Sequence, residues 1–120
     1  MQYSNIAQLA EENENFRKVL FTNGQSQVVL MSIKPGEDIG KEVHDVDQIL
    51  YFVAGSARAE VGGDTIEVTA GDLVDVPSGT EHNFINTGSE DLKLFTVYAP
   101  PEHPDGTIHA TKAEAEAAEQ

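Results

Sequence analysis

The sequence predicts an all-β protein, a sandwich or barrel of short strands with a short helix at each end. After Phe16 the chain consists of short segments rich in β-branched and aromatic residues. Clusters of Gly, Pro, Asn and Asp separate these segments about every eight to twelve residues, a spacing typical of sandwiches and barrels. No helical pattern intervenes between them, so we expect the strands to pair with one another rather than alternate with helices.

Composition limits the kind of protein. The chain of 120 residues has the length of one domain, which can bury a single core. It has no cysteine, which excludes disulfides and thiolate metal sites. The first residues lack a secretory pattern and no run approaches the ~20 apolar residues of a membrane span. We therefore expect a soluble, cytoplasmic protein of one domain, residues 1–120.

The formal net charge is −14, with 21 acidic against 7 basic residues. Such an acidic protein is not expected to bind nucleic acid or anionic membranes, because phosphate groups need a basic surface. The acidic surface either keeps the protein soluble or is an adaptation to a high-salt host. The partner is expected to be a small molecule.

At the N-terminus, Ser4 is expected to cap a short helix through residues 5–13, in which Ile6, Leu9 and Ala10 form one stripe. The barrel core is expected over about residues 16–100. Its predicted strands are 19–22, 26–34, 39–45, 49–55, 56–62, 65–71, 73–77, 82–88 and 92–100.

Between the strands, Gly55, Gly71 and Gly79 are expected to occupy turns that need positive φ, with Pro77 stiffening the last of them. Asp45 and Asp47 are interpreted as turn residues, or else as hydrogen-bond partners of nearby imidazoles.

The chain after residue 100 is expected to be a covering segment, 101–120, which begins with a proline-rich loop. Thr111 followed by Glu114 predicts a capping box, and the Ala/Glu tail behind it a short helix. His103 and His109 lie in this segment. They are either surface loop residues or part of a lid over the barrel mouth that carries a proton shuttle.

Polar residues interrupt the apolar pattern just before and within the strand at 49–55. If residues 41–45 are extended, Glu42 and His44 point to one face and Val43 to the other. Gln48 opens the next strand, on the same face as Leu50 and Phe52. His82 begins a later strand after a Pro/Gly turn. Convergence of these four polar side chains would suit a divalent first-row metal. An exposed strand and a lone half-buried histidine explain the same residues without a metal.

Two spaced motifs resemble those of the cupin family. The first comprises Gly36, Glu42, His44, Gln48 and Gly55, and the second comprises Gly71, Pro77, Gly79, His82 and Asn86. The chain is similar to small single-domain cupins of the mannose-6-phosphate-isomerase-like group over roughly Val28–Pro100. The resemblance implies a double-stranded β-helix, the jelly-roll barrel of that family.

The first motif departs from the family pattern. Glu42 stands where the family has its first histidine, and Gln48 where it has a glutamate. The resemblance implies that Glu42, His44 and His82 hold Fe(II), Mn(II), Ni(II) or Zn(II), with Gln48 as a weak fourth ligand or a neighbour. A cupin that has lost its metal and kept the barrel is the alternative.

The resemblance leaves two classes of function open. One is a metal-dependent enzyme, similar to the dioxygenases or isomerases of the family, acting on a small anionic oxygenated substrate. The other is a non-catalytic cupin that binds a metal or small ligand, such as a sensor. Strands 49–53 and 94–98 are apolar on both faces, so we also expect a homodimer that covers one of these faces.

Overall fold

The computed structural model describes residues 1–119 and confirms the all-β class. Its helices are α1 (Ile6–Glu12) and α2 (Lys112–Ala118). Its strands are β1 (Arg17–Thr22), β2 (Gln27–Ile33), β3 (Asp47–Ala54), β4 (Ser56–Val61), β5 (Asp64–Thr69), β6 (Leu73–Val76), β7 (His82–Asn86), β8 (Leu92–Ala99) and β9 (Ile108–His109). Within residues 1–119, no helix is both long enough and apolar enough to cross a bilayer.

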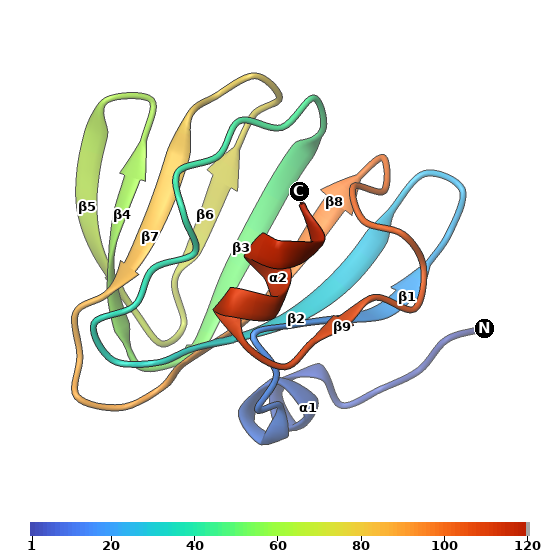
Figure 1. The fold of residues 1–120 in the computed structure, drawn as a ribbon, viewed down its shortest axis with the longest axis horizontal. Coiled ribbons are helices and arrows are strands. Elements are labelled where there is room, and N and C mark those ends of the chain that lie inside the picture. The colour runs from blue at the N-terminus through green and yellow to red at the C-terminus, as the bar shows by residue number, and fades with distance from the viewer. Residues whose placement is uncertain (120) are drawn as a thin grey trace.

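The strands form two antiparallel sheets that face each other as a jelly roll (Figure 1). The larger has the order β6-β3-β8-β2-β1-β9 and the smaller β5-β4-β7. The two sheets do not close into one continuous barrel. Their inner faces enclose the core, where the rings of Phe52 on β3 and Phe84 on β7 lie 5.8 Å apart between centroids.

Strand β3 shows how the sequence pattern specifies this core. Gln48, Leu50 and Phe52 are all buried, whereas Asp47 before them and Ile49 between the first two are exposed. The predicted shared face of these three residues is therefore confirmed, because side chains two apart in a strand point the same way. It follows that the amide of Gln48 is directed into the interior between the sheets.

The predicted strand at 39–45 is wrong as a continuous element. Only two isolated bridges form, Asp38 with Ile85 and Glu42 with His82. Gly40 has φ +107° and donates its N–H to the side chain of Asn83 at 3.0 Å, so the regular ladder is interrupted there. The segment still runs beside β7.

Three smaller differences lie at the ends of elements. Asn5, not Ser4, caps α1 and accepts from the N–H of Gln8 at 3.3 Å. Thr111 caps α2 as predicted, but Glu114 accepts from the N–H of Ala110 rather than from that of the cap residue. Strand β9, which pairs with β1, was not predicted.

The predicted turn glycines are confirmed, since Gly55, Gly71 and Gly79 all have positive φ. At Gly55 space is restrictive as well, because a Cβ would lie 3.0 Å from the carbonyl oxygen of Asp91. A side chain there would meet backbone that cannot move cheaply.

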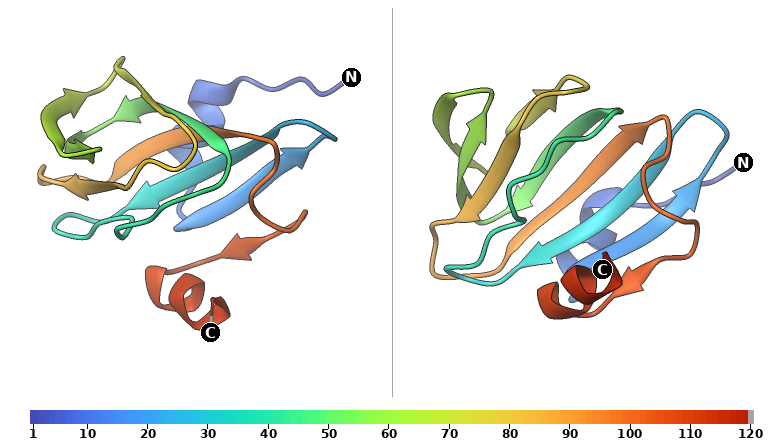
Figure 2. Two further views of the ribbon diagram at one scale, coloured as in Figure 1. Left: turned by 90° about the horizontal axis from the view of Figure 1, so that it is seen from above. Right: turned by 45° about the horizontal axis from the view of Figure 1, so that its top comes forward.

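The two helices lie on opposite sides of the larger sheet (Figure 2, left). Helix α1 contacts β2, β3 and β8 on the outer face. Helix α2 follows β9 and is tied by an ion pair between Lys112 and Asp38 to the segment that precedes Glu42. The C-terminal segment therefore sits beside the polar residues at the start of β3 and β7.

Candidate metal centre

Three elements bring the predicted site residues together. Glu42 and His82 face each other across a backbone bridge, and the rings of His44 and His82 lie 5.3 Å apart between centroids. Gln48 is the second residue of β3 and reaches the same region through Tyr98, whose ring lies edge-on to His44 at 5.7 Å. The bridge to β7 thus joins Glu42 and His82, forty positions apart in the sequence, and the pairing of β3 with β8 places Gln48 beside Tyr98.

His82 is oriented by the backbone. Its Nδ1 lies 2.8 Å from the carbonyl oxygen of Thr80. Because a carbonyl oxygen only accepts, Nδ1 must carry the proton, and in the neutral ring Nε2 then has a free lone pair. This is the tautomer in which a histidine binds a metal through Nε2, with its other nitrogen held by an oxygen acceptor.

His44 lies between two carboxylates. Its Nε2 is 2.7 Å from Glu42 and its Nδ1 is 3.3 Å from Glu102. The hydrogen bond with Glu42 raises the pKa of His44, although burial opposes this. Burial raises the pKa of Glu42, but the hydrogen bond and charge of His44, together with Arg17, bring it below its ordinary value. The pair is therefore favoured as imidazolium and carboxylate.

Gln48 contributes a buried oxygen with no partner. Its Nε2 donates to the hydroxyl of Thr96 at 3.1 Å and to that of Tyr98 at 3.2 Å, while Oε1 has no hydrogen bond. The residue is only 2% exposed. A buried carbonyl oxygen without a donor is costly, so this atom calls for a cation or a hydrogen-bond donor.

The chemistry of this donor set fits a divalent first-row ion: one carboxylate oxygen, two imidazole nitrogens and one amide oxygen. As the side chains stand, however, no group of three or more His, Asp or Glu within residues 1–119 is placed to hold an ion. Glu42 and His44 are instead bonded directly to each other. Loading would require His44 to lose its Nε2 proton and Glu42 to turn away from that nitrogen.

The oxygens that hold the two imidazoles are not those that the sequence suggested. Glu102, which contacts His44, lies in the proline-rich loop and carries no local signal. Asp47 is the first residue of β3 rather than a turn residue and accepts from the N–H of Ser78 at 3.0 Å, while Asp45 lies in the exposed bend before that strand, as interpreted. Glu102 and the Thr80 carbonyl, rather than these two aspartates, therefore hold the imidazoles.

Tyr98 on β8 reaches the site and lies between two histidines. Its ring is edge-on to His44 on one side and to His103 on the other, at 5.1 Å. Burial raises the pKa of Tyr98 well above its ordinary value, so the phenol stays neutral. His103 is thus part of the interior wall, and His109 in β9 lies 3.4 Å from Arg17.

His103 should make the protein less stable in acid. Burial, reinforced by the charge of Arg17, lowers the pKa of His103 to about 4, against about 6.5 in an unfolded chain. At pH values between these two pKa values, the unfolded state binds more protons than the folded state. The contribution of His103 to the free energy of unfolding is therefore complete above the unfolded pKa and is lost as the pH falls toward the folded pKa. In His103→Gln the loss of unfolding free energy from pH 7 to pH 4 should be smaller by about 1–2 kcal/mol, allowing for solvent screening. Urea unfolding at both pH values measures it, and an equal loss in both proteins would contradict it.

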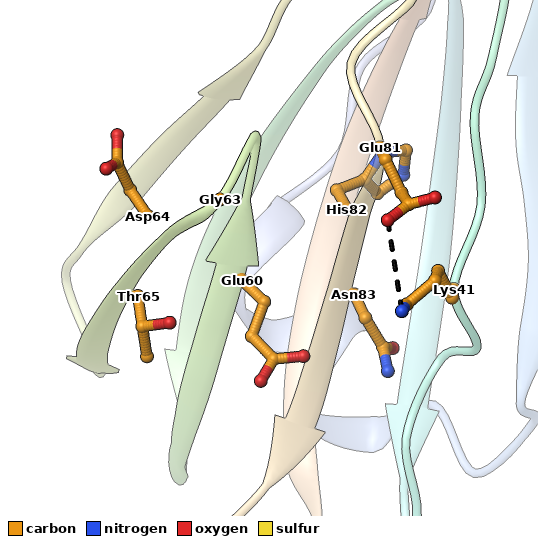
Figure 3. A pocket seen from close by; sticks show the side chains of 8 residues that line it. All are labelled: Lys41, Glu60, Gly63, Asp64, Thr65, Glu81, His82 and Asn83. Atoms are coloured by element: carbon orange, nitrogen blue, oxygen red, sulfur yellow. Dashed lines mark ion pairs between the residues drawn. The ribbon is translucent and has the colours of Figure 1, made fainter.

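A pocket of about 280 Å³ lies over the smaller sheet and shares His82 with the polar cluster, but has none of Glu42, His44 and Gln48 in its lining (Figure 3). Glu81 points toward Lys41 there, forming an exposed ion pair of 3.8 Å. Within residues 1–119, three buried side-chain atoms have no hydrogen-bond partner, and none of them belongs to a residue that lines this pocket. We therefore place the candidate site at Glu42, His44, Gln48 and His82.

The family description "Cupin domain" matches residues 29–98, more than half of the chain and both motifs. The chain is a cupin. This family accounts for the jelly-roll sheets and for the position of the polar cluster between them.

Relatives of this cupin carry names that assign no activity. "Uncharacterized protein YrkC" of Bacillus subtilis is 45% identical over 96% of this chain, and "Uncharacterized protein L612" of Acanthamoeba polyphaga mimivirus is 42% identical over 87%. The cupin covers 66% of YrkC and 68% of L612, so both relatives extend beyond the matched region. The crystal structure of BH2720 from Bacillus halodurans is 42% identical, with a TM-score of 0.95 over 97% of this chain and 93% of that one.

Proposed function

We propose that this cupin binds one divalent transition metal ion through Glu42, His44 and His82, with Gln48 as a weak fourth ligand. We further propose that it is a metal-dependent enzyme, dioxygenase- or isomerase-like, that acts on a small anionic oxygenated substrate. The observation that carries the proposal is the buried, partnerless Oε1 of Gln48, whose amide contacts Tyr98, together with the imidazole of His44 packed edge-on to that tyrosine and 5.3 Å from the imidazole of His82. Each of those imidazoles has its Nδ1 held by an oxygen.

Charge supports the choice of substrate class. Glu42 is the one carboxylate in the ligand set, so with neutral histidines a divalent ion would leave the site at +1. Positive charge in a water-poor site attracts an anion strongly. A bound metal ion would supply Lewis-acid polarisation of a substrate oxygen, or oxygen binding if it is iron.

The chain's own residues would orient the reactants. Glu102 holds the Nδ1–H of His44, which fixes the direction of that ring. Tyr98 supplies a neutral phenol that can donate or accept one hydrogen bond at the wall of the site. Phe84, which packs near His82, keeps water from that side.

A second candidate function is a non-catalytic cupin that binds a metal or a small ligand, such as a sensor. The direct bond between Glu42 and His44 favours it, because the pair is already satisfied without an ion. Oxygen consumption and substrate turnover by the metal-loaded protein, measured over a panel of small hydroxy and keto acids, separate the two. Saturable binding without turnover would favour the second candidate.

The experiment that tests the metal proposal is a calorimetric titration of chelator-treated protein with Fe(II), Mn(II), Ni(II) and Zn(II) in turn. We expect one site per chain for at least one of these ions. Because His44 must release a proton, the observed heat should depend on the ionisation enthalpy of the buffer. Absence of saturable binding for all four ions would reject the proposal.

We also propose that the outer face of the larger sheet forms a homodimer. Tyr51 on β3 stacks on Phe95 on β8 at 5.3 Å, beside Ile49 and Leu73, which are 40% and 62% exposed. Apolar side chains adjacent on one face favour burial against a partner. Light scattering at micromolar concentration should give twice the chain mass.

The matched control for the dimer uses two equally exposed residues. Leu73→Asp on the larger sheet should give a monomer, while Ile66→Asp on the smaller sheet, also 62% exposed, should not. If the wild type is a monomer, or if both substitutions dissociate the dimer alike, the proposed interface is wrong.

A further inference from the structure

A second cavity is lined in part by His103, whose ring packs edge-on against Tyr98. It has a volume of about 160 Å³ and is enclosed by β1, the loop after β8, β9 and the end of α2. Its lining includes Arg17, His103 and His109. Of the three buried side-chain atoms without a hydrogen-bond partner in residues 1–119, two belong to this lining: Nε of Arg17 and Nε2 of His103.

Arg17 is a buried cation whose ion pair with Glu42 is long. It is only 2% exposed. Its NH1 lies 3.4 Å from Nδ1 of His109, and its NH2 lies 4.0 Å from Glu42, beyond hydrogen-bond distance. A guanidinium has five N–H donors, and a buried charge is costly unless it is both paired and hydrogen-bonded. The side chain is therefore short of acceptors.

The opposite wall of the cavity is held rigidly. Gln27 is fully buried and accepts from the N–H groups of Glu102 and His103, at 3.3 and 3.0 Å, while its Nε2 donates to the carbonyl of His103 at 2.7 Å. The ring of His103 is fixed in turn against Tyr98. Its partnerless Nε2 is thus presented to the cavity by a fixed backbone, as a preorganised site requires.

We propose that this cavity binds a small monocarboxylate anion, held by the guanidinium of Arg17 with His103 completing its hydrogen bonds. The fork of a guanidinium matches a carboxylate with two parallel hydrogen bonds. The volume is about five times the ~30 Å³ that one water occupies in the liquid, which suits an anion of formate or acetate size.

Local charge favours a monoanion over a dianion. Arg17 is the one permanently charged cation of the lining, and the carboxylate of Glu119 lies at the rim. The single positive charge of Arg17 attracts one negative charge, and the carboxylate of Glu119 opposes the entry of a second. Inorganic phosphate should therefore bind more weakly than acetate at neutral pH.

This inference goes beyond the proposed metal function and does not depend on it, since Arg17 and His103 are not in the proposed ligand set. The test is accordingly made on chelator-treated protein. Failure of anion binding would leave the metal proposal standing, and failure of metal binding would leave the anion site standing.

The chain has two arginines, Arg17 and Arg58, so its side-chain Nε–Hε groups give two resonances in a proton–nitrogen correlation spectrum. Arg58 is on the smaller sheet, with an exposed side chain paired with Glu60. The spectrum of Arg58→Met assigns the two signals. Titration of wild type with sodium acetate, against equal sodium chloride, should shift the Arg17 signal saturably and leave that of Arg58 unmoved. An unmoved Arg17 signal, or equal shifts in both, would overturn the site.

Two charge-matched variants then measure affinity by calorimetry. Arg17→Met should weaken acetate binding by about tenfold or more, whereas Arg58→Met should change it by less than about twofold. Equal loss in the two variants would mean a general charge effect and would overturn the site. Phosphate binding tighter than acetate would overturn the monocarboxylate assignment. The resonance titration needs no substitution at Arg17, so it still shows whether acetate binds in this cavity if Arg17→Met fails to fold.

Discussion

His82→Ala is expected to purify with metal close to background, while wild type grown in the same medium carries about one ion per chain. Alanine removes one of two imidazoles from the proposed ligand set. Loss of an outer partner already costs about 10–100-fold in metal affinity, so loss of a ligand should cost more than that. Elemental analysis of both proteins after identical purification measures the difference.

The control for this substitution is His109→Ala. His109 lies in β9 beside Arg17, outside the proposed ligand set, so its loss should leave the metal content unchanged. Circular dichroism should show that both variants keep the β fold. A His82→Ala protein with the wild-type load would mean that the ion is held elsewhere.

Gln48→Glu is expected to hold metal at least as tightly as wild type while losing affinity for small carboxylates in the metal-loaded form. A second carboxylate at the ion would reduce the site from +1 to neutral, which removes the attraction for an anion. The hydroxyls of Thr96 and Tyr98, which now accept from Gln48, can rotate to donate to the introduced carboxylate. The fold should therefore tolerate the change.

The same substitution should make metal binding more sensitive to pH. Burial and the nearby carboxylate of Glu42 would both raise the pKa of the introduced acid, so protons would compete with the ion more strongly. Two calorimetric titrations measure the effect: metal into chelator-treated protein, and oxalate into the loaded protein. Unchanged oxalate affinity would mean that Gln48 only orients its neighbours. The Arg17 cavity is a separate anion site, so the acetate shift of the Arg17 resonance provides the internal control.

The sequence predicted the parts of the fold that depend on local chemistry. Positive φ at Gly55 and Gly79 follows from turn spacing, and the inward direction of Gln48 follows from its alternation with Leu50 and Phe52. The start of β7 at His82 follows from the Pro/Gly turn before it.

The errors and omissions lie where contacts distant in sequence decide. The segment at 39–45 has the composition of a strand, but the side chain of Asn83 takes the N–H of Gly40 and breaks the ladder. Glu102 reaches His44 only because Gln27, far along the chain, clamps its loop. Arg17 begins a strand with no motif around it, so sequence alone gave no reason to place it beside the site.

The most direct test of the metal centre is elemental analysis of wild-type protein purified without added metal or chelator, with each ion counted per chain. We expect close to one equivalent of a single first-row divalent ion, lost from His82→Ala and retained by His109→Ala. Wild-type protein with no ion above background, which also fails to take one up when Fe(II), Mn(II), Ni(II) or Zn(II) is supplied, would contradict it.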